Sequence, residues 1–299
     1  EFGWQPIILT APLDEKPGQT YRIVETGYRN ALGFWIGLLR LNPDEDLRKQ
    51  VKQRFGVTAK KSLLDRLLTF AGEIVNYPDS DKGWQPFAVK AGDEVIRREG
   101  IDAIISTSAP MTVHTIAREL KSRHNIHWLA ALRDLWSQNH NYSYSRVRRW
   151  FDMRLELKTL SAADALITVS RPWADKLGSL HKNKTIYAIT NGFDPELVNI
   201  PPVELTAKFT ITYTGLIYPG KQDTARLFAA LRELISGGVI DPDSLEVRLY
   251  GAGAEWLDRE IKQYGLSDVT RQYPQVPRDV ALEKQRESQL LLLLNWDDP

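Results

Sequence analysis

The chain of 299 residues contains no cysteine, which excludes disulfide bonds, thiolate metal sites and a cysteine nucleophile. It also lacks any apolar run of the roughly 18–20 residues that a membrane-spanning helix needs. Its formal net charge is only +1, so no whole-protein field attracts nucleic acid. The start, Glu1-Phe2-Gly3-Trp4, has neither the basic nor the apolar region of a signal peptide. These absences predict a cytoplasmic protein that does not bind nucleic acid.

The length predicts two domains, because single cores rarely grow much beyond about 250 residues. The contents of hydrophobic residues, 42%, and of charged residues, 26%, are typical of a globular protein. Prolines interrupt the chain at Pro195 and at Pro201-Pro202, where a helix cannot continue. We therefore expect one domain at residues 1–200 and a second at residues 201–299.

Strand-like and helix-like segments alternate along the chain. The expected strands are Ile7–Thr10, Ala103–Ser106, Trp128–Leu132, Ala165–Ser170, Ile186–Ile189, Thr210–Thr214, Glu246–Tyr250, Val269–Tyr273 and Leu290–Leu294. The expected helices are Trp84–Glu99, His114–Arg123, Arg146–Ala162, Asp223–Ile235 and Glu255–Tyr264. This alternation predicts an α/β fold of parallel sheets with helices on both faces. Residues from about 27 to 77 do not alternate and are expected to form a mostly helical insertion.

Polar residues follow the strands of the first half. The run Trp128–Leu132 ends in Arg133-Asp134, and the run Ala165–Ser170 ends in a hydroxyl. The carboxyl ends of parallel strands meet at one edge of a sheet, where α/β proteins build their sites. Arginine does not act as a base but holds anionic oxygens, so Asp134 is the better candidate base. The alternative for the pair is a strand-end ion pair.

His114 lies one turn into a helix that Pro110 begins. It either points into the same edge or forms a local hydrogen bond.

Glycine-containing loops follow the strands of the second half. Gly215 opens a loop that ends with Lys221 before a helix, which predicts an anion site made of backbone amides, a helix start and a cation. Gly251 and Gly253 follow the next strand, although Trp256 breaks the complete G-x-G-x-x-G pattern. The alternative is an ordinary strand-to-helix turn with a solvated lysine.

The order of these motifs resembles the N-terminal half of GT-B glycosyltransferases, most of all the retaining family 4. The resemblance rests on Arg133-Asp134 after a strand, on Ala163–Ser170 and on Asn191–Asp194. It implies two Rossmann-like domains facing a cleft, with the acceptor on the N-terminal domain and a nucleotide diphospho-sugar on the C-terminal one. The implied reaction is sugar transfer to an acceptor hydroxyl with retention, in bacterial polysaccharide or glycoconjugate synthesis. No metal or other cofactor is expected.

The resemblance also assigns roles. It implies catalytic roles at the acceptor for Arg133, where the family commonly has histidine, and for Asp134 and His114. It implies donor contacts by Gly215, Lys221, Gly251, Gly253 and Val276. In the family a first strand with its Gly-rich loop comes before such a chain, and two donor-site glutamates come after it. The resemblance thus implies an enzyme of which the given sequence is a part, with loss of activity through truncation as an open alternative.

Three further expectations stay open. Arg146–Phe151 is basic and aromatic, which suits a peripheral contact with an anionic membrane or a lipid-linked glycan acceptor, or simply a solvated helix start. Glu156 matches an acidic position of the family or belongs to a surface ion-pair network. The alternatives to a transferase are a nucleotide-sugar 2-epimerase of the same architecture and a non-catalytic fragment or sugar-binding subunit.

Overall fold

The computed structural model describes residues 3–13, 21–29, 72–74, 76–142, 144–193, 195, 201, 203–251 and 253–295. Most of the expected helical insertion at about 27–77 lies outside these residues. The chain divides into two compact units, Glu1–Gly192 and Phe193–Pro299, so the division falls after Gly192 rather than after residue 200. None of the helices in the described ranges is both long enough and apolar enough to cross a bilayer.

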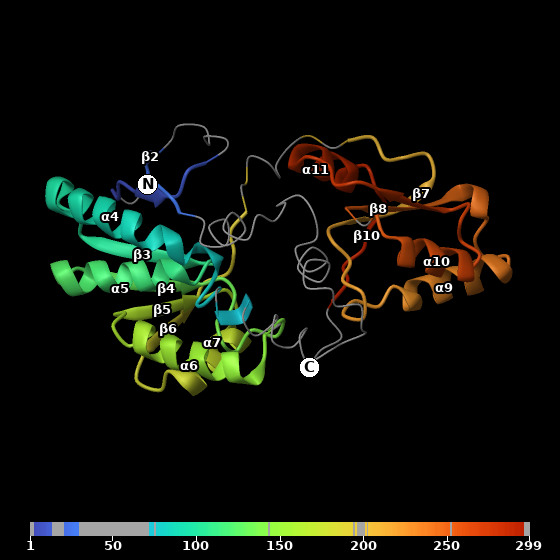
Figure 1. Cartoon of the computed structure of the whole chain (residues 1–299). Coiled ribbons are helices and arrows are strands. Elements are labelled where there is room, and N and C mark those ends of the chain that lie inside the picture. The colour runs from blue at the N-terminus through green and yellow to red at the C-terminus, as the bar shows by residue number, and fades with distance from the viewer. Residues whose placement is uncertain are drawn as a thin grey trace, which may run out of the picture. The chain divides into compact units, whose positions relative to one another are not determined.

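Unit 1 contains a parallel sheet whose four strands lie side by side in chain order (Figure 1). Its strands are β3 (Ala103–Ser108), β4 (His127–Leu132), β5 (Ala165–Thr168) and β6 (Thr185–Ala188). The helices that connect them are α5 (Thr112–His124), α6 (Arg146–Leu160) and α7 (Arg171–Leu180). Each strand is followed by its next neighbour in the sheet, and right-handed crossovers then place all the connecting helices on one face.

One core of unit 1 reflects this arrangement. Trp128 and Leu132 of β4 are completely buried, and they cluster with Ala117 of α5, Leu160 of α6 and Leu177 of α7. The opposite face is different, because Ile105 is 69% exposed and Tyr187 is 51% exposed. The expectation of helices on both faces is therefore wrong for the described part of this sheet, and the unidirectional strand order is the reason.

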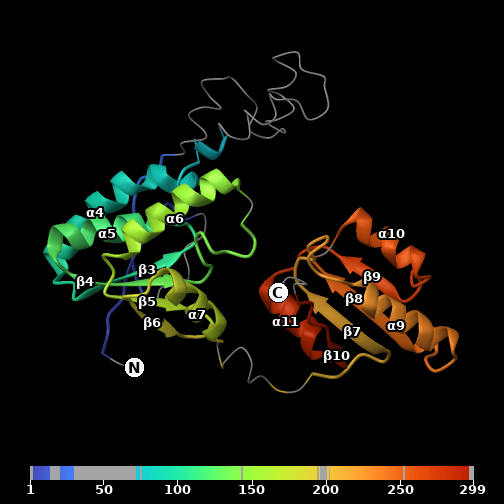
Figure 2. The same ribbon diagram turned by 90° about the horizontal axis from the view of Figure 1, so that it is seen from below.

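A second, smaller sheet of unit 1 pairs β1 (Ile7–Thr10) with β2 (Arg22–Glu25) in parallel. It packs on α4 (Gln85–Glu99), which follows a short 3-10 turn at Ser80–Trp84. Leu9 of β1 joins a cluster with residues of α4 and α5, and Figure 2 shows α4, α5 and α6 side by side. The sequence did not indicate β2, because its outer residues Arg22 and Glu25 are charged and only two apolar residues lie between them.

Hydroxyl side chains determine where two helices of unit 1 begin. Ser145 accepts a hydrogen bond from the Arg148 amide at 3.2 Å and caps α6. Ser170 accepts one from the Trp173 amide at 3.4 Å and caps α7, which the sequence analysis missed. Ser170 therefore ends no strand, since β5 stops at Thr168 and the serine starts the next helix.

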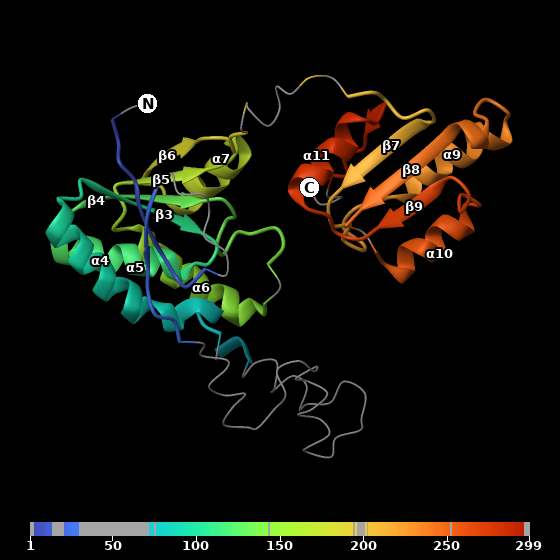
Figure 3. The same cartoon turned by 90° about the horizontal axis from the view of Figure 1, so that it is seen from above.

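Unit 2 has a parallel sheet in the order β10-β7-β8-β9. Its strands are β7 (Phe209–Thr214), β8 (Leu245–Tyr250), β9 (Thr270–Tyr273) and β10 (Leu290–Leu291), and Figure 3 shows β7, β8 and β9 side by side. Its helices are α9 (Ala225–Ser236), α10 (Glu255–Gln263) and α11 (Arg278–Arg286), with a 3-10 turn at Pro242–Ser244. The chain moves outward from β7 to β9 and then returns to the other side of β7. This reversal puts α11 on the opposite face from α9 and α10 (Figure 1).

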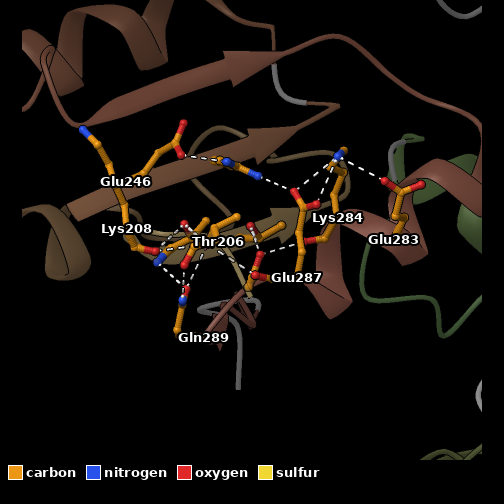
Figure 4. Close-up of polar contacts among 11 residues, drawn as sticks. Thr206, Lys208, Glu246, Glu283, Lys284, Glu287 and Gln289 are labelled. Carbon is orange, nitrogen blue, oxygen red and sulfur yellow. Dashed lines mark hydrogen bonds and ion pairs between the residues drawn. The ribbon is translucent and has the colours of Figure 1, made fainter. Parts of the chain in front are cut away.

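The two faces of the second sheet are held differently. Phe228 of α9 and Leu257 of α10 are completely buried against Val247 and Leu249 of β8. No described residue of α11 is fully buried, and polar contacts hold the end of this helix instead (Figure 4). Arg248 of β8 bridges Glu246 at 2.8 Å and Glu287, just after α11, at 2.5 Å.

The chain after α11 is fixed by a second set of polar contacts. The Gln289 side chain accepts from the Thr210 amide at 2.7 Å and donates to the Thr206 carbonyl at 2.8 Å. These bonds join the beginning of β7 to the residue before β10, and so they set the pairing of these strands.

Candidate active site

A cavity of about 460 Å³ lies at the carboxyl edge of the first sheet. Its volume is within the range of small-molecule sites, about 300–1,000 Å³. Each strand, or the segment that follows it, contributes to the wall. The lining residues are Thr107, Ser108, Ala109, Arg133, Asp134, Val169, Trp173 and Asn191. The structure thus brings together two of the strand-end positions that the sequence singled out, the Arg133-Asp134 pair and Asn191.

Arg133 and Asp134 are exposed to this cavity between buried neighbours. Leu132, which precedes them, is held by the Thr168 hydroxyl, which donates to its carbonyl at 2.9 Å. Leu135 and Trp136, which follow them, are buried. The polar pair is therefore fixed at both ends by the core, and it presents one proton acceptor and one fixed cation to a ligand.

Glu156 of α6 holds the same loop through hydrogen bonds from Ser137. It is completely buried, and its Oε2 accepts from the Ser137 amide at 3.0 Å and from the Ser137 hydroxyl at 2.5 Å. Its Oε1 lies 3.3 Å from Nε2 of His181 at the end of α7. Glu156 thus belongs to no surface network. Sequence reasoning missed this role because nothing in the spacing shows that Ser137 and His181 converge on it.

His114 is the one predicted catalytic residue that the structure places elsewhere. Its side chain is completely buried, and Nδ1 lies 2.8 Å from the Ser106 hydroxyl. The Trp128 indole donates to that same hydroxyl at 2.8 Å, which leaves the serine proton for Nδ1. Burial lowers the pKa of His114 to about 3. Of the two alternatives for His114, the structure shows the local hydrogen bond, because the helix turns this side chain toward the core.

Ser108 adds a feature that the sequence did not indicate. It lines the cavity at the end of β3 and is 2% exposed. Its Oγ has no hydrogen-bond partner among the described residues. Buried hydroxyls are usually paired, so this one is available to a bound ligand.

In unit 2 the predicted glycines lie at the carboxyl edge of the second sheet. The Gly215 amide donates to the Tyr250 carbonyl, and the Gly251 amide donates to the Tyr273 carbonyl, both at 3.0 Å. Gly251 has φ +84°, and a Cβ on it would lie 3.1 Å from the Gly215 carbonyl oxygen. The positive φ and this close approach of two strand-to-helix loops both favour glycine at this position.

The loop from Gly215 to Lys221 lies at the topological switch point of this sheet, between β7 and β10. Gln222 is buried; its side chain accepts from the Tyr218 amide at 3.0 Å and donates to the Leu294 carbonyl at 2.9 Å. It therefore ties together the segments after the two strands. Ligands of open α/β sheets bind in such crevices.

The remaining donor-site predictions fall on neighbouring loops. Gly253 is exposed after β8, and Val276 is half-buried between β9 and α11. One amide at the start of α9 is already hydrogen-bonded within the protein, because the Asp223 side chain accepts from the Ala225 amide at 2.8 Å. Half-buried Lys221 and the loop amides, rather than the start of this helix, are thus the candidate anion contacts.

Comparisons with known proteins support the family. The model of Glycosyltransferase Family 4 matches residues 58–197, a range that contains β3 to β6 and the whole lining of the first cavity. No curated protein matches the chain.

Solved structures of similar proteins share little sequence with the chain. Sucrose-phosphate synthase from Thermosynechococcus elongatus is 16% identical, over 69% of this chain and 53% of its own, with a TM-score of 0.49. The lipopolysaccharide outer core galactosyltransferase WaaB is 14% identical over 69% of this chain and 53% of its own, with a TM-score of 0.43. A UDP-N-acetylglucosamine 2-epimerase is 13% identical over 96% of this chain and 74% of its own, with a TM-score of 0.40.

At these identities and TM-scores the solved structures indicate nothing about substrate or mechanism. The chain spans about half the length of the synthase and of the galactosyltransferase. The resemblance predicted from the sequence is confirmed to this extent: the model of Glycosyltransferase Family 4 matches residues 58–197.

Proposed function

We propose that the protein transfers a sugar from a nucleotide diphospho-sugar to an acceptor hydroxyl with retention of configuration. The observation that carries this proposal is the cavity at the ends of β3 to β6, which lies within the family-matched residues and holds Arg133, Asp134 and Ser108. In this proposal unit 1 binds the acceptor and unit 2 binds the donor.

The side chains have the chemistry that each half of the reaction needs. Asp134 is exposed to the cavity and accepts the proton of the acceptor hydroxyl. Arg133 holds an anionic oxygen, because its guanidinium stays charged and forms forked hydrogen bonds. At the switch point of unit 2, the Lys221 side chain stabilises the departing diphosphate, together with loop amides other than those of Gly215 and Tyr218, which donate to Tyr250 and Gln222. This positive charge makes a metal ion or other cofactor unnecessary in the proposed step.

We place the reaction in the cytoplasm, in bacterial polysaccharide or glycoconjugate synthesis. The absence of cysteine suits a reducing compartment.

The proposal is tested first by a thermal-shift screen of the protein with UDP-, GDP-, ADP- and TDP-sugars. We expect one nucleotide class to raise the melting temperature and Lys221→Ala to weaken its binding about tenfold or more, since a charge-assisted contact contributes about 1.5–3 kcal/mol. The matched control is Lys208→Ala, an exposed lysine just before β7 at the opposite edge of the sheet. Equal binding by wild type and Lys221→Ala would contradict the anion site.

The product then separates the reaction classes. NMR of the anomeric proton is expected to show transfer with the donor's configuration kept. Release of a 2-epimer from the nucleotide sugar without any acceptor would identify an epimerase instead. Binding of a sugar without turnover of any donor would identify a sugar-binding subunit.

A second element of the proposal is a peripheral contact between α6 and an anionic membrane. Val147, Trp150 and Phe151 are exposed on this helix, and exposed Arg154 lies over the Trp150 ring at 4.1 Å. The acidic residues of the same helix, Asp152 and Glu156, are buried. The solvent side of α6 is thus apolar and cationic, a composition that binds anionic interfaces. A lipid-linked glycan is the acceptor that such a contact would bring to unit 1.

Vesicle co-sedimentation tests this contact. We expect binding to phosphatidylglycerol vesicles, weakened by salt, and little binding to phosphatidylcholine vesicles. The double variant Trp150→Ser, Phe151→Ser is expected to lose most of the binding, whereas Tyr187→Ser, an equally exposed aromatic on β6, keeps it. Undiminished binding by the double variant would exclude α6 as the contact.

A further inference from the structure

We infer that unit 1 carries a second binding site, for an uncharged saccharide ring, in a cavity of about 420 Å³ next to the candidate active site. The inference rests on the proposed function and extends it, because it gives a sugar ring of the acceptor its place. Its lining comes from residues 78–81, the start of α5, the segment after β4 and Asp152 of α6. We call it the second cavity.

The second cavity adjoins the first one along the chain. Ala109 lines both cavities. Arg133 and Asp134 line the first, and the residues that follow them directly, Leu135 and Trp136, line the second. One segment therefore forms a wall of each, so a ligand that fills the second cavity lies beside the proposed base.

The walls of the second cavity are fixed before any ligand binds. Asp79 accepts from the Thr112 amide at 2.7 Å and from the Thr112 hydroxyl at 2.6 Å, which fastens its rim to α5. The Arg148 guanidinium lies between the rings of Tyr77 and Tyr144, at 4.8 and 4.7 Å from their centres. A preformed wall lowers the entropy lost on binding.

The chemistry of the lining matches a sugar ring, which has apolar C–H faces and a rim of hydroxyls. Trp136, Tyr142 and Tyr144 offer aromatic surface, which packs against apolar faces. Asn139 and Asn141 each offer an amide that both donates to and accepts from hydroxyls.

The same lining disfavours anionic ligands. Among the described residues that form it, none is lysine or arginine, so a phosphate finds no cation there, in contrast to Arg133 in the first cavity. Both oxygens of Asp79 already accept hydrogen bonds within the protein. Nor do three or more carboxylate or histidine side chains of the described residues come together there in a group that could hold a metal ion.

Asp152 gives independent evidence for a ligand. This residue lines the second cavity and is 2% exposed. Its Oδ2 accepts from the Tyr142 hydroxyl at 2.5 Å and from Arg148 Nε at 3.0 Å. Its Oδ1 has no partner among the described residues. A buried carboxylate oxygen is rarely left unpaired, and a sugar hydroxyl is the donor that this cavity would supply.

Saturation-transfer NMR of the 299-residue protein tests the site. The probes are the methyl glycosides of glucose, galactose, mannose and N-acetylglucosamine. We expect saturable binding of at least one glycoside, and at least tenfold weaker binding by Ser80→Trp, which fills the cavity from an exposed rim position. The matched control is Ser122→Trp, exposed on α5 and outside both cavities, which is expected to bind as wild type does.

Two outcomes would overturn the inference. One is that no glycoside binds the wild-type protein saturably. The other is that Ser80→Trp binds as tightly as Ser122→Trp. These titrations contain no nucleotide, so they give the same answer whether or not unit 2 binds a donor. Failure of this site is thus separable from failure of the proposed function.

Discussion

At the scale of single residues, the polar pair after β4 carries the proposed chemistry. Arg133 and Asp134 are exposed to one cavity, while the residues on either side of them are buried. Their substitution is therefore expected to affect the proposed activity without removing core contacts. Variants at these two positions therefore distinguish a catalytic role from a structural one.

We predict that Asp134→Asn lowers kcat about 100-fold or more, as loss of a general base does, and leaves the donor Kd within a factor of three. Arg133→Ala is expected to lower turnover in the same sense. Steady-state kinetics together with a donor titration measure both quantities. Asp102→Asn, an exposed carboxylate just before β3 at the opposite edge of the sheet, is the control and should retain wild-type turnover. Parallel losses of turnover and donor affinity would instead place the pair in the donor pocket.

We predict that His114 makes the free energy of unfolding depend on pH. Its pKa is about 3 in the folded protein because of burial, and its ordinary value is about 6.5. Below pH 6.5 His114 therefore binds a proton in the unfolded chain but stays neutral in the folded protein. The free energy of unfolding falls as the pH is lowered. Between pH 7 and pH 5 this one group lowers it by about 2 kcal/mol. Above pH 7 the histidine is neutral in both states and has no effect.

Urea unfolding of wild type and His114→Gln at pH 7 and pH 5 measures this effect. The variant is expected to lose about 2 kcal/mol less than wild type over that interval, because it has no imidazole to protonate. Identical losses in the two proteins would mean that His114 is accessible to protons when folded.

At the scale of elements, α6 performs two tasks. Its buried side holds the loop after β4 through Glu156, and its exposed side presents the apolar and cationic residues proposed to contact a membrane. The two tasks use opposite faces of one helix, so they are separable by mutation. Substitutions on the buried face are expected to affect stability, and substitutions on the exposed face are expected to affect the proposed vesicle binding.

We predict that Glu156→Ala lowers the free energy of unfolding of unit 1 by about 2–4 kcal/mol, because it leaves the Ser137 amide and hydroxyl and His181 unpaired in the core. Glu156→Gln keeps an acceptor and should lose less. Chemical denaturation followed by tryptophan fluorescence measures the change. Asp175→Ala, which breaks an exposed ion pair on α7, is the control and should change stability by less than about 0.5 kcal/mol. A loss for Glu156→Ala as small as that of the control would refute the anchoring role.

At the scale of the whole molecule, each unit has its own sheet and its own core. The clusters around Trp128 and Leu9 consist of residues of unit 1, and the cluster around Val247 consists of residues of unit 2. Each sheet also has its own carboxyl edge, with the polar pair on one and the glycine loops on the other. The proposed function assigns one substrate to each edge.

Hydrogen exchange with mass spectrometry tests this assignment. A nucleotide diphosphate is expected to slow exchange at residues 215–222 and 250–254 of unit 2, because its phosphates engage the loop amides there. Residues 107–110 and 133–141 of unit 1 should exchange as they do without ligand. Protection confined to the unit 1 loops would reverse the assignment of donor and acceptor.

The sequence by itself determined the α/β class, the nine expected strands and the strand-end positions of Arg133-Asp134 and Gly215. Hydrophobic runs and turn residues are local features, so they can be recognised one segment at a time. The tertiary structure decided what depends on distant segments. It decided that β10 returns beside β7, because the pairing partner of a short strand is not a local property. It also decided that His114 and Glu156 face the core, since their partners Ser106, Ser137 and His181 come from other elements. Burial is a property of the packed chain, and so the choice between a catalytic and a structural side chain was made only by the fold.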